Sequence, residues 1–116
     1  MTTGRRSHQV ADLLREELAI LIQGLRDPRV GFVTVTAVRL SPDLKNARVL
    51  ISVLDQNGGN PETLEGLGRA AGWLRRELAR RTYLKHVPQL SFEVDDSIRR
   101  GARIEALLSG AEPEDE

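Results

Sequence analysis

The spacing of the apolar residues changes three times along this chain, and the order of these changes restricts the fold more than any other feature. Between residues 10 and 25 the spacing is three and four, which predicts a helix with one apolar face. Residues 32–40 and 46–55 alternate and are rich in β-branched side chains, so they predict two antiparallel strands. The helical spacing returns from residue 61, and a third strand is expected in 88–95. Helices packed on one face of a small sheet belong to the α+β class.

Turn and cap residues predict where these elements begin and end. Ser7 has a side chain that can cap the first helix, and the glycines and proline of residues 24–31 end it. The stretch 41–45 carries turn residues between the two strands. Asn60 followed by Pro61 predicts the start of the next helical region. The apolar stripe of that region consists of Leu64, Leu67, Ala71, Leu74 and Leu78.

The charges separate a basic body from a short acidic end. The net charge is zero, but four of the 17 acidic residues lie in positions 112–116. We therefore expect a flexible arm over 1–5, one domain over 6–109 and a disordered acidic tail over 110–116. A short helix is also predicted within 101–108. The chain has no cysteine for a disulfide and no apolar run of about 18 residues for a membrane span, so we expect a cytoplasmic location. A monomer is our default for the oligomeric state.

Arginine is concentrated in one stretch, residues 69–85, which holds six basic residues and one acid. On an unbroken helix, Arg69, Trp73, Arg76 and Arg80 lie on one side, opposite the leucines. Arginine binds phosphate through charge and forked hydrogen bonds, and an indole stacks on bases, so this side is a candidate nucleic-acid interface. The alternative is an ordinary solvated face. The candidate phosphate contacts are Arg69, Arg75, Arg76, Arg80, Arg81 and Lys85.

Gly72 lies inside this stretch, shortly after Gly66 and Gly68. Each glycine costs a helix about 1 kcal/mol relative to alanine. Such a cost favours a geometric role, either a kink or a close approach of helix to sheet, over tolerated drift on an exposed surface. A kink would change the phase of the helix and can turn Trp73 into the core, so we favour a buried Trp73 over one that stacks on RNA, and both positions stay open.

Catalytic motifs are absent from the sequence. It has no phosphate loop and no dinucleotide-binding glycine fingerprint. His8 and His86 are far apart and lack the spacing of metal ligands. Asp95 and Asp96 are adjacent in a strand end and point to opposite faces, which favours a turn or cap over a carboxylate pair. The sequence therefore indicates a binding protein, not an enzyme, with no metal and no cofactor.

Four short motifs of this chain are specific in combination. They are the "DPR-G" turn, the "S-D" after the first strand, the step of Ala70, Ala71 and Gly72, and the "VP-L-F--D-S" close of the last strand. Taken together, they resemble the ribosome-binding factor A family of bacterial small-subunit assembly factors. The resemblance runs over residues 5–108.

This resemblance implies a type II KH-like fold of order α-β-β-α-α-β. Ordinary KH domains hold single strands with a G-x-x-G loop between two helices, and this chain contains no such loop. The family has Ala-x-Gly at an interhelical kink, matched here by Ala70, Ala71 and Gly72. The implied structure is a helix-kink-helix at Ala70–Gly72 whose basic second half faces ribosomal RNA.

The implied function is that of a non-catalytic factor that binds the immature 30S subunit through 16S rRNA. Family members support late maturation, including 5′-end processing of the 16S rRNA precursor, and growth in the cold, and a ribosome-associated GTPase promotes their release. Some carry a longer basic C-terminal extension, whereas this chain ends in a short acidic tail, so contacts from such an extension are not implied. The competing functions are a KH-like RNA- or DNA-binding domain without a ribosomal role and a protein-interaction module.

Overall fold

The structure, a computed structural model, describes residues 2–25, 30, 33–53 and 61–96. The predicted terminal helix, the acidic tail and Asn60 lie outside these residues. None of the described helices is long and apolar enough to cross a bilayer. The elements within the described residues are α1 (Thr2–Gln23), β1 (Val33–Leu40), β2 (Asn46–Val53), α2 (Pro61–Arg81) and β3 (Gln89–Val94).

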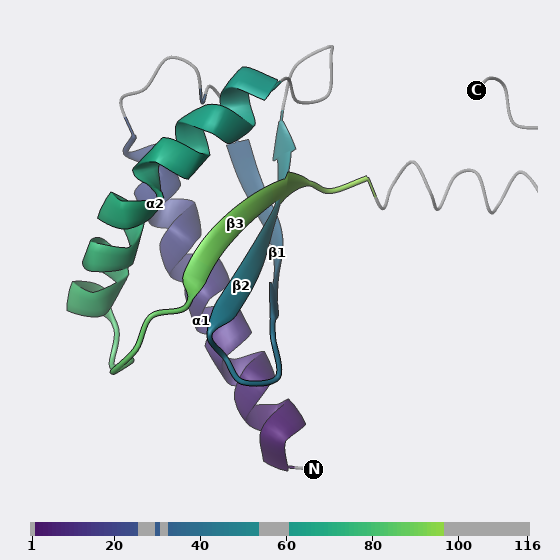
Figure 1. Ribbon diagram of the computed structural model, residues 1–116, viewed down its shortest axis with the longest axis vertical. Coiled ribbons are helices and arrows are strands. Elements are labelled where there is room, and N and C mark those ends of the chain that lie inside the picture. The colour runs from purple at the N-terminus through teal and green to yellow at the C-terminus, as the bar shows by residue number, and fades with distance from the viewer. Residues whose placement is uncertain (1, 26–29, 31–32, 54–60, 97–116) are drawn as a thin grey trace, which may run out of the picture.

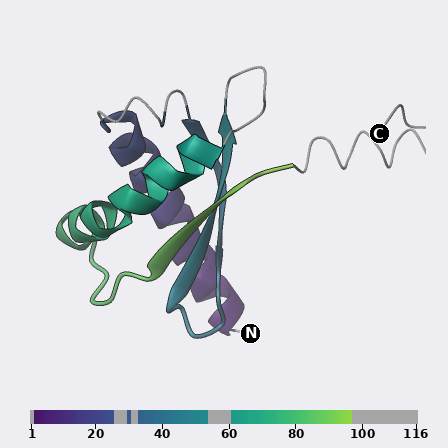
Figure 2. The same ribbon diagram turned by 45° about the horizontal axis from the view of Figure 1, so that its top comes forward.

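The strands form a sheet in the order β1-β2-β3, in which β1 and β2 run antiparallel and β2 and β3 run parallel. Helix α1 packs against β1 and α2 packs against β3, and the two helices also contact each other (Figure 1, Figure 2). The arrangement confirms the predicted α+β class and the antiparallel pairing of the first two strands.

One apolar core joins both helices to the sheet. Helix α1 contributes most of the residues that its spacing predicted, the half-buried Leu13 excepted, and β2 contributes alternate residues on the face toward the helices. Burying an aliphatic side chain is worth about 1.5–3 kcal/mol, so these two elements supply much of the folding free energy. The buried residues of α1 and β2 on this face are Val10, Leu14, Leu18, Leu21, Ile22, Ala47, Val49 and Ile51.

Helix α2 differs from the prediction in its continuity. Two helices were expected, but the helix runs unbroken from Pro61 to Arg81. Its axis nevertheless changes direction partway along, as Figures 1 and 2 both show. The expected helix-kink-helix is therefore a single bent helix. A helix can bend in this way over about one turn without losing its backbone hydrogen bonds.

The apolar stripe of α2 also differs by one position. Leu67, Leu74 and Leu78 are fully buried, as predicted. Between them, Ala70 packs against the core, where Ala71 was expected. The spacing of three and four is kept by positions 67, 70, 74 and 78. The apolar stripe therefore stays on one side of the helix before and after the bend.

The first helix begins earlier than predicted. Ser7 was expected to cap it, but α1 starts at Thr2, so Ser7 lies inside the helix and residues 2–5 belong to it. Each residue added to a formed helix gains a hydrogen bond, and nothing in residues 2–6 stops the helix as proline would. At the other end Gly24 N–H donates to the Leu21 carbonyl at 3.1 Å, close to the predicted stop.

A β-bulge in β1 shifts its pattern. Val35 pairs with Ile51 and Ala37 pairs with Leu50, so Thr36 is an extra residue without a partner position. The predicted alternation of Val33, Val35 and Ala37 therefore fails after Val35. Beyond the bulge it is Val38, 9% exposed, that faces the core, whereas Ala37 is only half-buried.

Candidate nucleic-acid interface

The predicted arginine stripe, Arg69, Trp73, Arg76 and Arg80, forms an exposed side of α2. All four residues lie on the surface, and Trp73 has 39% of its surface accessible. The expectation that Trp73 turns into the core is wrong, because the helix is continuous and its bend does not rotate Trp73 toward the buried leucines. The indole remains among the arginines, where stacking on a base is possible.

Three guanidinium groups of this stripe are available to a partner. Within the described part of the chain, neither Arg69 nor Arg76 forms a hydrogen bond or an ion pair. Arg80 lies 3.5 Å from a Glu77 oxygen, and its side chain is 78% exposed. Such a long, exposed pair contributes little stability, so Arg80 can exchange it for a phosphate.

Arg75 has a different position from its neighbour Arg76. Its Nε donates to the Pro88 carbonyl at 3.1 Å, while its Nη2 donates to the Val87 carbonyl at 3.0 Å, in a half-buried setting. These bonds tie α2 to the segment that leads into β3. Arg75, which was predicted as a phosphate contact, therefore donates two hydrogen bonds within the protein, and we assign it a structural role.

Arg81 also bonds within the protein. Its Nε donates to Glu17 Oε1 at 2.7 Å, which links the last turn of α2 to the middle of α1. The pair is partly exposed, so its contribution to stability is of the order of 1 kcal/mol or less. A phosphate that contacts Arg81 must compete with Glu17.

Lys85 lies beyond the end of α2. The helix ends at Arg81, where the Thr82 hydroxyl and backbone N–H both donate to the Leu78 carbonyl, at 2.7 and 3.0 Å. Lys85 therefore does not continue the arginine stripe, although the sequence placed them in one stretch. It lines a groove of about 1030 Å³ with residues of α1 and of the β1–β2 turn.

We call this second feature the hairpin groove. Its lining brings together residues that are far apart in the sequence, and most of them were not among the predicted contacts. The turn before β2 carries the "S-D" motif but no concentration of positive charge, so only the folded chain reveals this site. The polar and aromatic residues that line it are Arg6, Asp43, Lys45, Asn46, Arg75, Tyr83, Lys85, His86 and Gln89.

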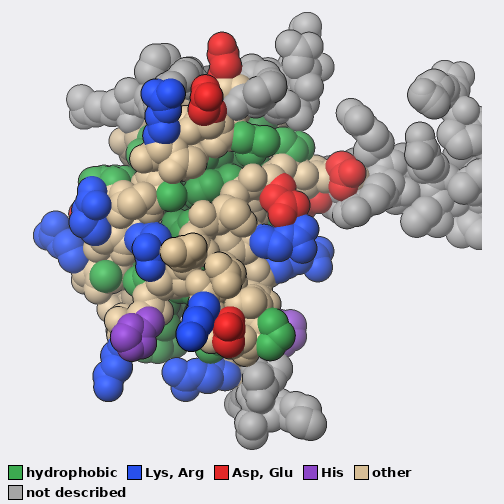
Figure 3. Space-filling view, in the orientation of Figure 1, with side chains coloured by type: hydrophobic (Ala, Val, Ile, Leu, Met, Phe, Trp, Pro, Cys, Tyr) green, Lys and Arg blue, Asp and Glu red, His purple; other side chains and the backbone are tan. Residues whose placement is uncertain are grey.

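Positive side chains thus occupy several regions of the surface. In Figure 3, Lys and Arg side chains lie along the side of the molecule formed by α2, at the end that carries the β1–β2 turn, and beside acidic side chains at the right of the view. The histidines His8 and His86 are both exposed, and the described residues contain no group of three potential metal-binding side chains.

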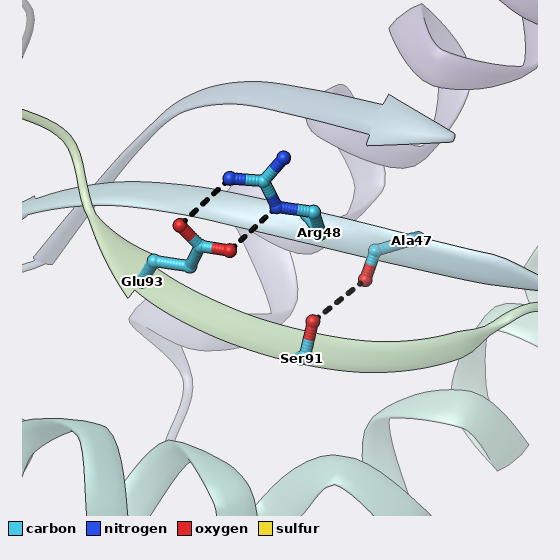
Figure 4. A network of polar contacts seen from close by, with 4 residues as sticks. All are labelled: Ala47, Arg48, Ser91 and Glu93. Atoms are coloured by element: carbon cyan, nitrogen blue, oxygen red, sulfur yellow. Dashed lines mark hydrogen bonds and ion pairs between the residues drawn. The ribbon is translucent and has the colours of Figure 1, made fainter. Parts of the chain in front are cut away.

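The sheet face that points away from the helices carries an ion pair. Arg48 on β2 donates from Nε and Nη2 to the two carboxylate oxygens of Glu93 on β3, at 2.6 and 2.9 Å (Figure 4). These hydrogen bonds lower the pKa of Glu93 and raise the pKa of Arg48. Next to the pair, the Ser91 hydroxyl donates to the Ala47 carbonyl at 3.5 Å.

The neighbouring Asp95 accepts a hydrogen bond from the Thr36 hydroxyl at 2.5 Å, so it bonds to the bulge of β1.

The surroundings of Gly72 exclude one of its two predicted roles. The residue is exposed, and a Cβ added there would meet only Arg76 Nη1, at 3.6 Å. This is an ordinary contact, so the helix does not approach the sheet closely at this point. The close-approach explanation is wrong, and a bend and tolerated drift on the exposed surface remain as the two explanations for the glycine.

Comparison with known proteins identifies relatives of the whole fold. The family model described as "Ribosome-binding factor A" matches residues 6–108. A ribosome-binding factor A of Syntrophus aciditrophicus is 44% identical over 117 aligned residues, which cover 100% of this chain and 95% of that protein.

Solved structures agree with this match. The crystal structure of ribosome-binding factor A from Thermus thermophilus is 34% identical, with a TM-score of 0.70 over 76% of this chain and 93% of the other. A homology model of the T. thermophilus protein, fitted into an electron cryo-microscopy map of its complex with the 30S subunit, is 35% identical. Its TM-score is 0.64, over 74% of this chain and 91% of the other. These neighbours share the KH-like fold.

Proposed function

The chain belongs to the ribosome-binding factor A family, and from this membership we propose that it binds the immature 30S ribosomal subunit through 16S rRNA. The arginine stripe of α2 is the observation that carries the proposal. Arg69, Arg76 and Arg80 point to solvent on one side of a helix, with no partner or only a weak one inside the described protein. A row of exposed cations of this kind can neutralise phosphates of an RNA backbone.

We infer that binding is steric and electrostatic. The domain would hold one local conformation of the immature RNA and dissociate when the subunit matures, without catalysing a reaction. The proposal extends to late maturation of the subunit, to processing of the 5′ end of the 16S rRNA precursor and to growth in the cold. It also includes release promoted by a ribosome-associated GTPase, a monomeric state and a cytoplasmic location next to the ribosome.

Co-sedimentation with purified 30S particles tests the proposal. We expect the wild-type protein to sediment with 30S particles and not with 50S particles. If Arg69, Arg76, Arg80 and Lys85 each neutralise one phosphate, log K should fall with log salt at a slope of about −3. A slope near zero, or equal binding to both particles, would contradict the proposal. Chemical protection of the RNA in the bound particle then locates the site.

We also propose that the bend of α2 lies at Ala70, Ala71 and Gly72. Gly68 serves as a matched control, since it is exposed in the same helix and an added Cβ has nothing within 4 Å. Gly68→Ala should raise the free energy of unfolding by about 0.5–1 kcal/mol, because alanine favours the helix. Gly72→Ala should raise the free energy of unfolding by less than Gly68→Ala does, because alanine at the bend opposes the change in direction of the helix. Urea unfolding measures both, and equal gains would show that the bend does not depend on Gly72.

A further inference from the structure

The hairpin groove lies apart from the arginine stripe, at the end of the molecule where three segments meet. Arg6 and Val10 come from α1, residues 43–46 come from the β1–β2 turn, and residues 83–89 connect α2 to β3. The groove has a volume of about 1030 Å³, the upper size of a typical small-ligand pocket. One nucleotide with its neighbouring phosphates fits in such a space.

The rim of the groove carries an excess of positive charge. Arg6, Lys45 and Lys85 are exposed and form no ion pair within the described part of the chain. The acid in the lining is Asp43, and its Oδ1 already accepts from the Ser41 hydroxyl at 2.7 Å and from the Lys45 backbone N–H at 3.0 Å. These neutral donors hold the carboxylate in place and leave its negative charge, so three cations against one acid give the rim a net positive charge that favours an anionic ligand.

An aromatic ring is presented at this rim. Tyr83 is 72% exposed, the largest fraction among the large hydrophobic residues that the structure describes as exposed. Leu84 and Val87, on the same segment, pack partly against the core and anchor the segment that carries the ring. An exposed ring above a rigid support is the arrangement on which single-stranded bases stack.

Two carboxamide side chains lie next to each other in the same groove. Asn46 opens β2 and Gln89 opens β3, and the two residues are paired across the parallel strands. Their backbone groups are bonded to Ser41 and Lys45, whereas their side-chain amides form no hydrogen bond within the described residues. A pair of free amides offers both donors and acceptors, as the edge of a nucleobase requires.

The turn that forms one wall has a strained backbone. Leu44 has φ of 62°, the left-handed region that non-glycine residues rarely adopt. Its N–H donates to the Ser41 carbonyl at 2.9 Å, which helps to hold this conformation. Glycine would adopt it without strain, so the presence of leucine here favours a role for the side chain as a wall of the groove.

We propose that the hairpin groove binds one unpaired nucleotide of RNA. Its base stacks on Tyr83, the base edge faces Asn46 and Gln89, and the adjoining phosphates contact Lys45 and Lys85. This inference rests on the proposed function, which supplies RNA as the partner. It adds a single-strand site to the charged face of α2, so that the protein distinguishes an unpaired segment of RNA from a duplex.

Fluorescence anisotropy with the full chain tests the groove. The probes are a short single-stranded RNA of mixed sequence, labelled with fluorescein, and the duplex of the same RNA with its complement. Tyr83→Ala should weaken binding of the single strand by about tenfold or more, because stacking on an aromatic side chain contributes that much per base. Binding of the duplex should change less than about twofold, because duplexes are held mainly through the backbone. Tyr83→Phe should keep the wild-type affinity for both probes.

The outcomes separate the groove from the proposed function. Equal single-strand affinity of Tyr83→Ala and the wild type overturns the groove site, and so does an equal loss for single strand and duplex. If Arg76→Glu with Arg80→Glu still abolishes 30S binding in that case, the proposed function stands. If the wild type does not sediment with 30S particles, the proposed function fails whatever the groove binds. Thermal unfolding confirms that each variant is folded, as expected for a side chain that is 72% exposed.

Discussion

A protein that carries Arg76→Glu together with Arg80→Glu should bind 30S particles about 30-fold more weakly than the wild type at about 0.1 M salt, or more weakly still. Each phosphate contact contributes about 0.7–0.9 to the slope of log K against log salt. The loss of two contacts therefore lowers K by about 30-fold at about 0.1 M salt, and repulsion between the new glutamates and the phosphates lowers it further. Both side chains lie on the surface, and neither contributes a strong bond inside the described protein. The fold should therefore be unaffected.

The matched control is Arg15→Glu with Arg39→Glu. These two residues are also exposed, on α1 and β1, and their reversal changes the net charge by the same amount. We expect the control to retain most of its 30S binding, and sedimentation at several salt concentrations compares the two proteins. Equal losses would mean that net charge, not the face of α2, controls binding.

The second large effect concerns stability. Arg75→Met should lower the free energy of unfolding by about 2 kcal/mol, because it removes two bonds from a charged donor to the Val87 and Pro88 carbonyls. Arg76→Met, one position along, should change it by less than about 0.5 kcal/mol, as is usual for a surface side chain without a bonded partner. Methionine keeps much of the length of arginine in both cases.

Urea unfolding followed by circular dichroism measures the difference between these neighbours. At temperatures where both variants are folded, Arg75→Met should also bind 30S particles more tightly than Arg76→Met. The assignment of Arg75 to structure and Arg76 to RNA fails if the two variants lose equal stability, or if Arg75→Met is the weaker binder.

The helices and strands were predictable from the sequence because their spacing is a local property. A helix repeats every 3.6 residues and a strand every two, whatever packs against them. The buried face of α1, with Leu14 and Leu18 at its centre, follows from that repeat. The break in the pattern of β1 was not predictable, because the extra residue Thr36 exists only relative to the partner strand β2.

The exposed arginine face of α2 was also predictable, since Arg69, Arg76 and Arg80 follow the helical repeat. The position of Trp73 was predicted wrongly because the effect of a bend on helix phase depends on packing, and here the phase is preserved. Arg75 and Arg76 cannot be distinguished by residue type. Their difference arises because the chain after α2 returns toward β3 and brings the carbonyls of Val87 and Pro88 to one of them.

The sequence by itself determined the element types, most of the core face of α1 and the charge of one side of α2, because these depend on residues a few positions apart. The tertiary structure alone decided which arginines of this stretch bond within the protein and which remain exposed without a strong partner among the described residues. It also assembled the hairpin groove, in which Arg6, Asn46 and Tyr83 meet from three distant segments. Contacts over such separations depend on the path of the chain through space, and no local repeat in the sequence encodes that path.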